Sequence, residues 1–249
     1  MIKNERENQI LKLLKENGGF ITVERLCREL YASPSSIRRD LSRLESSGNV
    51  KRCYGGAELV KSYSGSIPFN YRYSLNEKAK RIIAEKAVSL IKQNMVVFLD
   101  QSSSAFYVAT MLPNVKSLTI VTNNIEIINY LLPLNITVIS SGGVLCSDNR
   151  SCLIGQNAEY TFSKINADFA FISSKSLSLN GDISDCARDE LPVKDIMIKN
   201  ANKVVYLCDG SKIGTTSPYI QCDLSKINYL ISDVDCSFYK QNFPNLIIL

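Results

Sequence analysis

The segment between Ser33 and Leu44 constrains this 249-residue chain more than any other. Ser33 followed by Pro34 is a typical helix start, because the serine hydroxyl can accept a free backbone N–H and proline has none to leave unpaired. Ile37, Leu41 and Leu44 recur at the spacing of one helix face and predict a buried apolar stripe. The remaining positions carry hydroxyl and guanidinium groups. Such a helix suits phosphate oxygens and guanine edges in the major groove of a duplex.

A charged helix of this kind can also be an ordinary solvent-exposed surface, and the segments around it decide between the two interpretations. A helix predicted over residues 5–17 and a second one that Thr22 can cap come before it, in the order of a helix-turn-helix. Gly48 can end the third helix. Residues 49–57 then predict a small basic hairpin, which can act as a wing beside the third helix.

This N-terminal part of the sequence resembles a known family. The run from Ser36 to Leu41, with Gly48, Arg52 and Gly55-Gly56-Ala57 after it, is similar to the winged helix-turn-helix of the DeoR family of bacterial transcription regulators. The resemblance covers nearly all of residues 3–57 and implies binding to double-stranded operator DNA. The residues expected to contact DNA are Ser35, Ser36, Arg38, Arg39, Arg43, Lys51 and Arg52.

The composition excludes several classes of function. The chain has no histidine, which rules out Ser-His-Asp and Cys-His catalysis and His-ligated metal sites. We expect no catalytic residues, no metal and no organic cofactor. The net charge of +5 is compatible with a nucleic-acid partner without requiring one.

No apolar run reaches the roughly 18 residues of a membrane span, and the charged start lacks a signal sequence. The chain is therefore expected to be cytoplasmic, with reduced cysteines and no membrane partner.

A different pattern begins near residue 76. Residues 58–75 lack sustained periodicity and predict a linker, after which predicted helices alternate with short apolar runs. This alternation is typical of an α/β domain with a mostly parallel sheet. The predicted strands lie at 95–99, 118–121, 136–139, 168–172, 203–207, 229–231 and 246–248. The predicted domains are a winged helix-turn-helix over 1–57, a linker over 58–75 and a larger α/β domain over 76–249.

Polar residues gather directly after several of these strands. In open α/β sheets, ligands bind beyond the carboxyl ends of the strands, at a topological switch point. Serines at a helix start can hold an anion together with free backbone N–H groups, and a lysine can add positive charge. Individually, a serine run is commonly only a helix cap and a glycine pair only a turn. Together they predict a site for a small phosphorylated polyol, formed by Asp100, Ser102, Ser103, Ser104, Thr122, Asn123, Gly142, Gly143 and Lys212.

The same residues resemble the C-terminal sensor domain of the DeoR family, over about 77–233. That resemblance implies a fold similar to ribose-5-phosphate isomerase and glucosamine-6-phosphate deaminase, with a phosphorylated sugar or related metabolite as effector. Ser104 stands where the family usually has threonine, which keeps the hydroxyl. The segment 173–188 fits the family pattern poorly, and we assign no ligand contact to it.

The sequence thus predicts a transcription regulator of a carbohydrate-metabolism operon, most simply a repressor, that binds operator DNA as a homodimer or homotetramer. The alternative is a sugar-phosphate isomerase in which Asp100 acts as general base and Lys212 steadies an enediolate. The missing histidine and the lack of a second suitably spaced carboxylate disfavour it. A pure interaction scaffold would leave the arginine-bearing helix and the polar strand ends without a role.

Overall fold

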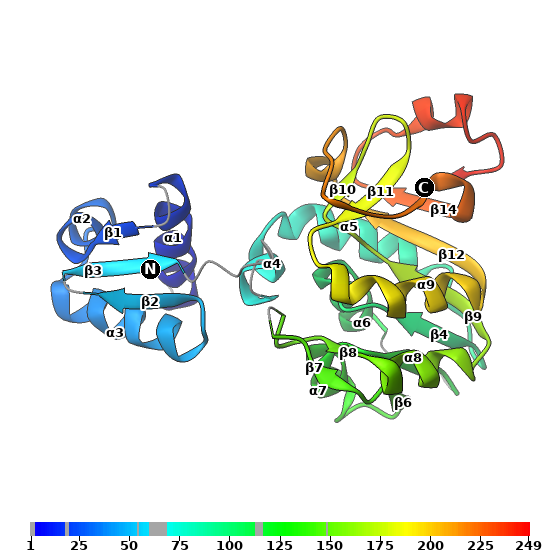
Figure 1. Cartoon of the computed structure of the whole chain (residues 1–249), viewed down its shortest axis with the longest axis horizontal. Coiled ribbons are helices and arrows are strands. Elements are labelled where there is room, and N and C mark those ends of the chain that lie inside the picture. Colours follow the sequence, from blue (N-terminus) through cyan, green and yellow to red (C-terminus); the bar gives the residue numbers. More distant parts are fainter. Residues whose placement is uncertain (1–2, 18–19, 54, 60–68, 113–116, 148) are drawn as a thin grey trace. The chain divides into compact units, whose positions relative to one another are not determined.

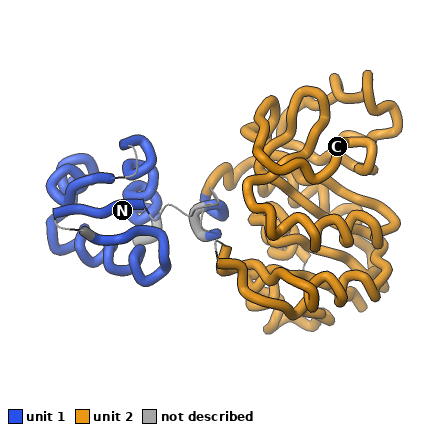
Figure 2. The backbone as a smooth tube through the Cα atoms, in the orientation of Figure 1, with its two compact units in different colours: residues 1–74 blue, residues 75–249 orange. Residues whose placement is uncertain are grey.

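The computed structural model describes residues 3–17, 20–53, 55–59, 69–112, 117–147 and 149–249. The chain forms two compact units, Met1–Ser74 and Leu75–Leu249 (Figure 2). Within the predicted linker, Glu58 and Leu59 complete a strand and Phe69–Ser74 form a short helix, α4. The residues between them lie outside the described ranges. Among the described helices, none has the length and apolar character that a membrane crossing needs.

The first unit is a three-helix core with a small sheet beside it. Its other elements are α1 (Lys3–Glu16), β1 (Phe20–Thr22), α2 (Val23–Glu29), α3 (Pro34–Ser46), β2 (Val50–Cys53) and β3 (Gly56–Leu59). The strands are antiparallel in the order β1-β3-β2, and β2 with β3 forms the predicted hairpin (Figure 1). Thr22 and Ser33 cap α2 and α3 through their hydroxyls, as expected. The stripe of Ile37, Leu41 and Leu44 is buried against α1 and α2.

The second unit is a layered α/β domain, which confirms the predicted fold class. Its helices are α5 (Glu77–Val88), α6 (Ser103–Thr110), α7 (Ile125–Leu131), α8 (Gln156–Ser163) and α9 (Leu191–Lys199). The main sheet comprises β4 (Val96–Leu99), β5 (Thr119–Thr122), β6 (Thr137–Ser140), β9 (Ala167–Ile172), β12 (Ala201–Cys208), β14 (Tyr229–Ser232) and β15 (Ile247–Ile248).

The seven strands are parallel throughout and lie in the order β15-β14-β12-β9-β4-β5-β6. Helices α5, α6 and α7 cover one face of the sheet, and α8 and α9 cover the other (Figure 1). The chain builds outward from β4 in one direction through β5 and β6, and in the other through β9 and β12. The switch point of the topology therefore lies between β4 and β9.

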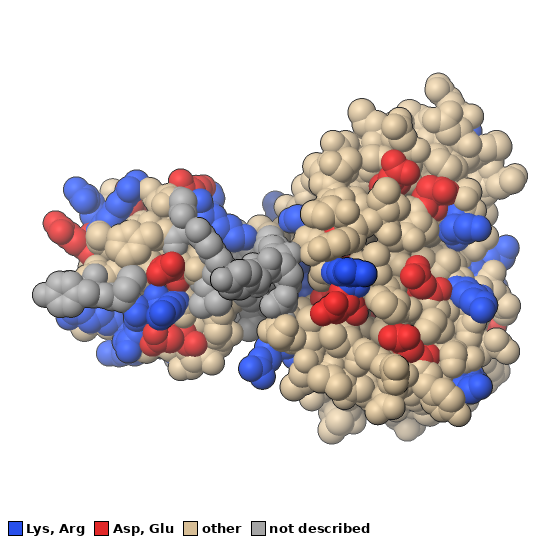
Figure 3. Space-filling model, in the orientation of Figure 1, with Lys and Arg blue, Asp and Glu red and all other residues tan. Residues whose placement is uncertain are grey.

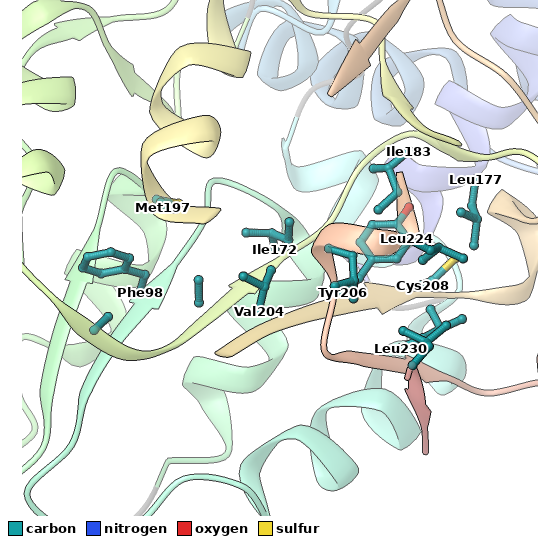
Figure 4. Packing of buried hydrophobic residues seen from close by; sticks show 14 of the residues in the cluster. Phe98, Ile172, Leu177, Ile183, Met197, Val204, Tyr206, Cys208, Leu224 and Leu230 are labelled. Carbon is teal, nitrogen blue, oxygen red and sulfur yellow. The ribbon is translucent and has the colours of Figure 1, made fainter. Parts of the chain in front are cut away.

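Strands that are buried on both faces read as continuous apolar runs, which is why the main sheet was predictable. Its core includes Phe98, Ile172, Tyr206 and Leu230, which belong to one buried cluster with Met197 of α9 (Figure 4). Two smaller sheets were not predicted. They are the ribbon of β7 (Val144–Leu145) and β8 (Leu153–Ile154), and the sheet of β10 (Ser176–Leu177), β11 (Asp182–Asp185) and β13 (Tyr219–Asp223). Their strands are too short, or too polar, to give a periodic signal.

Candidate functional site

Helix α3 turns two arginines toward solvent. Arg38 and Arg39 are exposed, and neither guanidinium has an ion pair or hydrogen bond with any group in the described part of the chain. The hydroxyls of Ser35 and Ser36 both lie 3.0 Å from the Ser33 hydroxyl, at the start of the helix. The buried stripe on the opposite side holds the helix in this orientation. The arrangement leaves two cations available to an external partner.

The net positive charge of the protein comes from the unit that carries α3. The first unit contains thirteen Lys and Arg against eight Asp and Glu, and the second contains sixteen of each. The whole net charge of +5 therefore belongs to the first unit. Basic side chains spread over the face of this unit that Figure 3 shows, with acidic ones between them. A basic domain next to a neutral one is the electrostatic pattern of a protein that binds a polyanion through one domain.

A groove of about 570 Å³ runs along α3, between the start of α2 and the turn of the hairpin. Arg38 of α3 and Arg52 of β2 both contribute to its walls, and Glu24 is the acidic residue among its lining residues. Gly56 lies at the base of the hairpin turn, where an added Cβ would come within 2.4 Å of the Ile21 carbonyl oxygen. Glycine is therefore required for β3 to approach β1 this closely.

Two of the arginines that we expected to contact DNA are already bound within the fold. Arg43 donates to Asp40 and, at 2.6 Å, to Oε1 of Glu7 on α1. Arg52 donates from Nε to Glu45 at 2.7 Å and from Nη1 to the Ser42 hydroxyl at 2.7 Å. These bonds give both arginines a bracing role that their sequence positions did not indicate. Lys51 of the same hairpin is exposed.

Asp40 is the centre of a buried ion-pair network that joins α1 to α3. Its side chain is fully buried and accepts hydrogen bonds from Arg43 and, at 2.5 Å, from Nε of Arg6. The bond from Arg6 to Asp40 raises the pKa of that guanidinium, so the arginine stays charged. The network fixes the orientation of α3 relative to α1. The direction in which Arg38 and Arg39 point depends on this orientation.

We expect Asp40→Asn to loosen this packing strongly, because it leaves two guanidiniums without their shared carboxylate. Loss of about 3 kcal/mol of local stability is expected, and amide exchange in α1 and α3 of the full-length protein should then rise by about 100-fold. Glu16→Gln, which removes a surface pair with Lys12, is the control and should leave exchange nearly unchanged. An Asp40→Asn protein with wild-type exchange in α3 would show that the network does not hold the helix.

In the second unit, Asp100 lies at the switch point, directly after β4. It is completely buried, and its Oδ1 accepts the backbone N–H of Ser102 at 3.0 Å. Its Oδ2 accepts the backbone N–H of Ser173, which follows β9, at 2.8 Å. Asp100 thereby joins the ends of the two strands between which the topology switches. Both of its oxygens are engaged by backbone donors.

Two lysines converge on Ser173 from different elements. Lys194 of α9 donates to the Ser173 carbonyl at 2.8 Å and lies 3.2 Å from Oδ2 of Asp185 and 3.9 Å from Oδ2 of Asp100. Lys212 donates to the Ser173 hydroxyl at 2.6 Å and lies 3.5 Å from Oδ2 of Asp209. The structure thus brings together Asp100 and Lys212, two of the predicted site residues, through a serine between them.

The opposite charges in this cluster stabilise the ionised forms of Lys194 and Asp209. Burial acts to lower the pKa of Lys194, but Asp185, Asp100 and Glu190 outweigh it and raise the pKa to about 12. Burial likewise opposes ionisation of Asp209, yet Lys212 and hydrogen bonds hold its pKa below the usual value. Lys194 and Asp209 are therefore both charged at neutral pH.

Ser102 and Ser104, two of the serines after β4, differ in how their hydroxyls are used. Ser102 caps α6 by accepting the N–H of Ala105 at 3.0 Å, which is the ordinary role of such a residue. The Ser104 hydroxyl is buried and has no hydrogen-bond partner among the described residues. A buried hydroxyl without a partner is costly, and a ligand or an ordered water commonly satisfies it.

After β5, Thr122 and Asn123 are completely buried. Thr122 donates to the Leu99 carbonyl at 2.7 Å, which ties β5 to the end of β4. Asn123 donates to the Leu153 carbonyl at 3.1 Å, and this bond fixes its amide so that the carbonyl oxygen Oδ1 points elsewhere. No described group bonds that oxygen. Like the Ser104 hydroxyl, it is a buried polar atom that lacks a described partner.

The backbone conformation explains why both residues of the predicted glycine pair are glycine. Gly142 and Gly143 have φ of +64° and +109° in the turn between β6 and β7. A Cβ at Gly143 would lie 2.4 Å from the Ile154 carbonyl oxygen. These residues shape the turn beyond β6, and no described contact links them to the Asp100 cluster.

Sequence reasoning missed four residues of the site: Ser173, Asp185, Glu190 and Lys194. Ser173 directly follows a predicted strand, so the rule that selected Asp100 would also have found it. Glu190 is buried and accepts hydrogen bonds from Gln101 at 2.6 Å and Asn149 at 2.8 Å. Lys194 shares the buried face of α9 with Val193 and Met197, and a lysine within such a stripe was the available signal.

Known proteins match the chain over both units. Residues 6–63 match the DeoR-like helix-turn-helix domain, and residues 75–234 match the DeoR C-terminal sensor domain. The transcriptional regulator GolR of Listeria innocua is 36% identical over 97% of this chain and 95% of its own. The L-fucose operon activator of Haemophilus influenzae is 33% identical over 92% of each chain.

A more distant relative is the glycerol-3-phosphate regulon repressor of Escherichia coli, 29% identical over 94% of this chain and 92% of its own. Among solved structures, ribose 5-phosphate isomerase A of Methanocaldococcus jannaschii aligns over 55% of each chain with 20% identity and a TM-score of 0.42. The two family matches together cover both units, and the alignment with GolR spans nearly the whole chain. The chain therefore belongs to the DeoR family of DNA-binding transcriptional regulators.

Proposed function

We propose that this protein represses a carbohydrate-metabolism operon and is released from its operator when a phosphorylated sugar or polyol binds the second unit. The observation that carries the proposal is the unpaired pair of guanidiniums on α3, in a unit that holds the entire net charge. Two or more chains would present α3 to DNA half-sites about one or more helical turns apart.

In this proposal Arg38 and Arg39 make the specific contacts of α3, because they are exposed and unpaired within the described chain. Ser35 and Ser36 lie beside them at the helix start and offer hydroxyls to a phosphate. Lys51 adds a cation from the hairpin. Arg43 and Arg52 serve chiefly to hold the interface in shape, since their guanidiniums are committed to Asp40, Glu7 and Glu45.

The effector is proposed to bind at the carboxyl ends of β4, β5 and β9. The positive end of the α6 dipole faces an anionic phosphate there, and Lys212 supplies a cation. The buried oxygens of Ser104 and Asn123 without described partners would take hydrogen bonds from the hydroxyls of the ligand. Asp100 is less suited to act as a catalytic base, because both oxygens already accept backbone N–H bonds.

A thermal-shift panel tests this site. The full-length protein is heated with D-ribose 5-phosphate, glycerol 3-phosphate, fructose 6-phosphate or inorganic phosphate. A ligand at 100 times its Kd stabilises by about 2.7 kcal/mol, which corresponds to a Tm rise of about 5–10 °C for a unit of this size. Lys212→Met should abolish the rise, whereas Lys240→Met, at an exposed position, should retain it.

Several outcomes would contradict the proposal. A panel without any shift would argue against a phosphorylated effector, and an equal shift in Lys212→Met would place the ligand elsewhere. The same samples are then examined for aldose–ketose interconversion. We expect none, and turnover that Asp100→Asn abolishes would establish an isomerase in place of a sensor.

A further inference from the structure

The second residue of the second unit has a left-handed backbone, and its amide nitrogen makes two hydrogen bonds. Asn76 precedes α5 with φ 52° and ψ 38°, in the left-handed region that asparagine tolerates better than most residues. It does not cap α5 with its side chain. Instead its Nδ2 donates to Oδ1 of Asp209 at 2.9 Å and to the hydroxyl of Ser211 at 2.8 Å. The amide thus binds the segment after β12 to the point where the chain enters the second unit.

That segment is the one that carries Lys212. Asp209 is buried, and its two oxygens face different partners, with Oδ1 toward Asn76 and Ser211 and Oδ2 toward Lys212 at 3.5 Å. Lys212 in turn donates to the hydroxyl of Ser173, whose N–H binds Asp100. A continuous series of polar contacts therefore runs from the switch point of the sheet to the first turn of the second unit.

The start of α5 is held at the same place by a second set of bonds. The Nζ of Lys80 donates to the Leu75 carbonyl at 2.6 Å, and its backbone N–H donates to the Asn76 carbonyl at 3.0 Å. Lys80 is buried and also acts electrostatically on Asp209. Asn76 and Lys80, which both lie at the start of α5, therefore both act on Asp209.

We propose that Asn76 is the positioning residue that transmits occupancy of the effector site to the segment leading toward the DNA-binding unit, through Asp209 and Lys212. The inference rests on the proposed function, because it is the effector that would engage Lys212. An anion that binds the Lys212 ammonium competes with the Asp209 carboxylate for this positive charge. Asp209 then depends more on Asn76 and Lys80, and the first turn of α5 takes a different equilibrium position. Such a two-state element is what coupling between distant sites requires.

The variant Asn76→Gly separates the side chain from the backbone. Glycine adopts the left-handed conformation without steric cost, so the turn is kept while both amide hydrogen bonds are removed. Glu77→Ala is the matched control at the next position, since Glu77 pairs only with Arg81 on its own helix in the described structure. Operator affinity of the full-length proteins is measured with and without D-ribose 5-phosphate, glycerol 3-phosphate or inorganic phosphate.

Coupling free energies between sites are commonly about 1–3 kcal/mol, which is about 5- to 150-fold in affinity. The wild type and Glu77→Ala are expected to lose operator affinity by such a factor with the active compound. Asn76→Gly should bind the operator and the compound as the wild type does, with the factor reduced to less than about threefold. An unchanged factor in Asn76→Gly would overturn the inference while leaving the proposed function intact.

A second measurement needs no effector. Amide hydrogen exchange over residues 69–82 is compared in the wild type, Asn76→Gly, Lys212→Met and the double variant. We expect Lys212→Met to speed exchange of the Lys80 amide, as Asn76→Gly does, with no further rise in the double variant. Unchanged exchange in Lys212→Met, or additive effects, would overturn the inference. If the exchange result holds and no compound alters operator affinity, the link stands and the proposed effector class fails.

Discussion

Replacing Lys194 with methionine is expected to lower the free energy of unfolding of the second unit by about 3–5 kcal/mol, the largest effect on stability that the structure suggests. Lys194 is almost wholly buried on α9 and is the cation between Asp185 and Asp100. It also donates to the carbonyl of Ser173. Methionine fills the same space but leaves the buried carboxylates without a counter-ion, and breaking a buried pair in this way costs far more than the pair contributes on balance.

Urea unfolding of the full-length protein, followed by circular dichroism, measures this loss. Lys199→Met on the exposed end of the same helix is the control and should stay within about 0.5 kcal/mol of the wild type. Because the pKa of Lys194 is raised to about 12 in the folded state, its contribution is present below the unfolded pKa near 10.5 and is lost as pH rises through 12. The difference between the proteins should therefore be constant from pH 6 to 9. A loss below 1 kcal/mol would show that water or rearrangement compensates the carboxylates.

This cluster illustrates which parts of the structure the sequence could not predict. Asp100 was selected because it follows a strand, a feature visible in a few consecutive residues. Its pairing with Lys194 depends on β4 lying beside β9, and no local pattern encodes that neighbourhood. Asp185 comes from a strand of the small sheet that periodicity missed. The place of this polar cluster at the strand ends was thus predictable, but most of its charged residues were not.

The first unit was predicted in greater detail because its determinants are local. A serine cap, a proline after it, an apolar stripe at i, i+4 and i+7, and a glycine stop together define α3. The sequence again did not indicate which residue each arginine would pair with. Arg43 looks like its neighbours Arg38 and Arg39 in the sequence, yet it faces Glu7 from a helix 36 residues earlier. Only the packing of α1 against α3 separates the bracing arginine from the two exposed ones.

The exposed pair is expected to dominate DNA binding. A good contact from arginine to a base or phosphate contributes about 1–3 kcal/mol, so each of Arg38→Ala and Arg39→Ala should weaken operator binding about tenfold or more. The double variant should lose about 100-fold. The fold should survive both changes, since neither side chain is bonded within the described chain. If an arginine contacts phosphate, its removal also flattens the dependence of log K on log salt by about one unit.

Fluorescence anisotropy with a duplex selected by the wild-type protein from random DNA, at two salt concentrations, tests the central claim most directly. Arg38→Ala/Arg39→Ala is compared with Lys226→Ala/Lys240→Ala, which removes the same charge from exposed positions of the second unit. We predict a loss of about 100-fold for the arginine pair and less than about threefold for the lysine pair. Equal affinities for the arginine variant and the wild type would contradict the assignment of α3 as the DNA-reading helix.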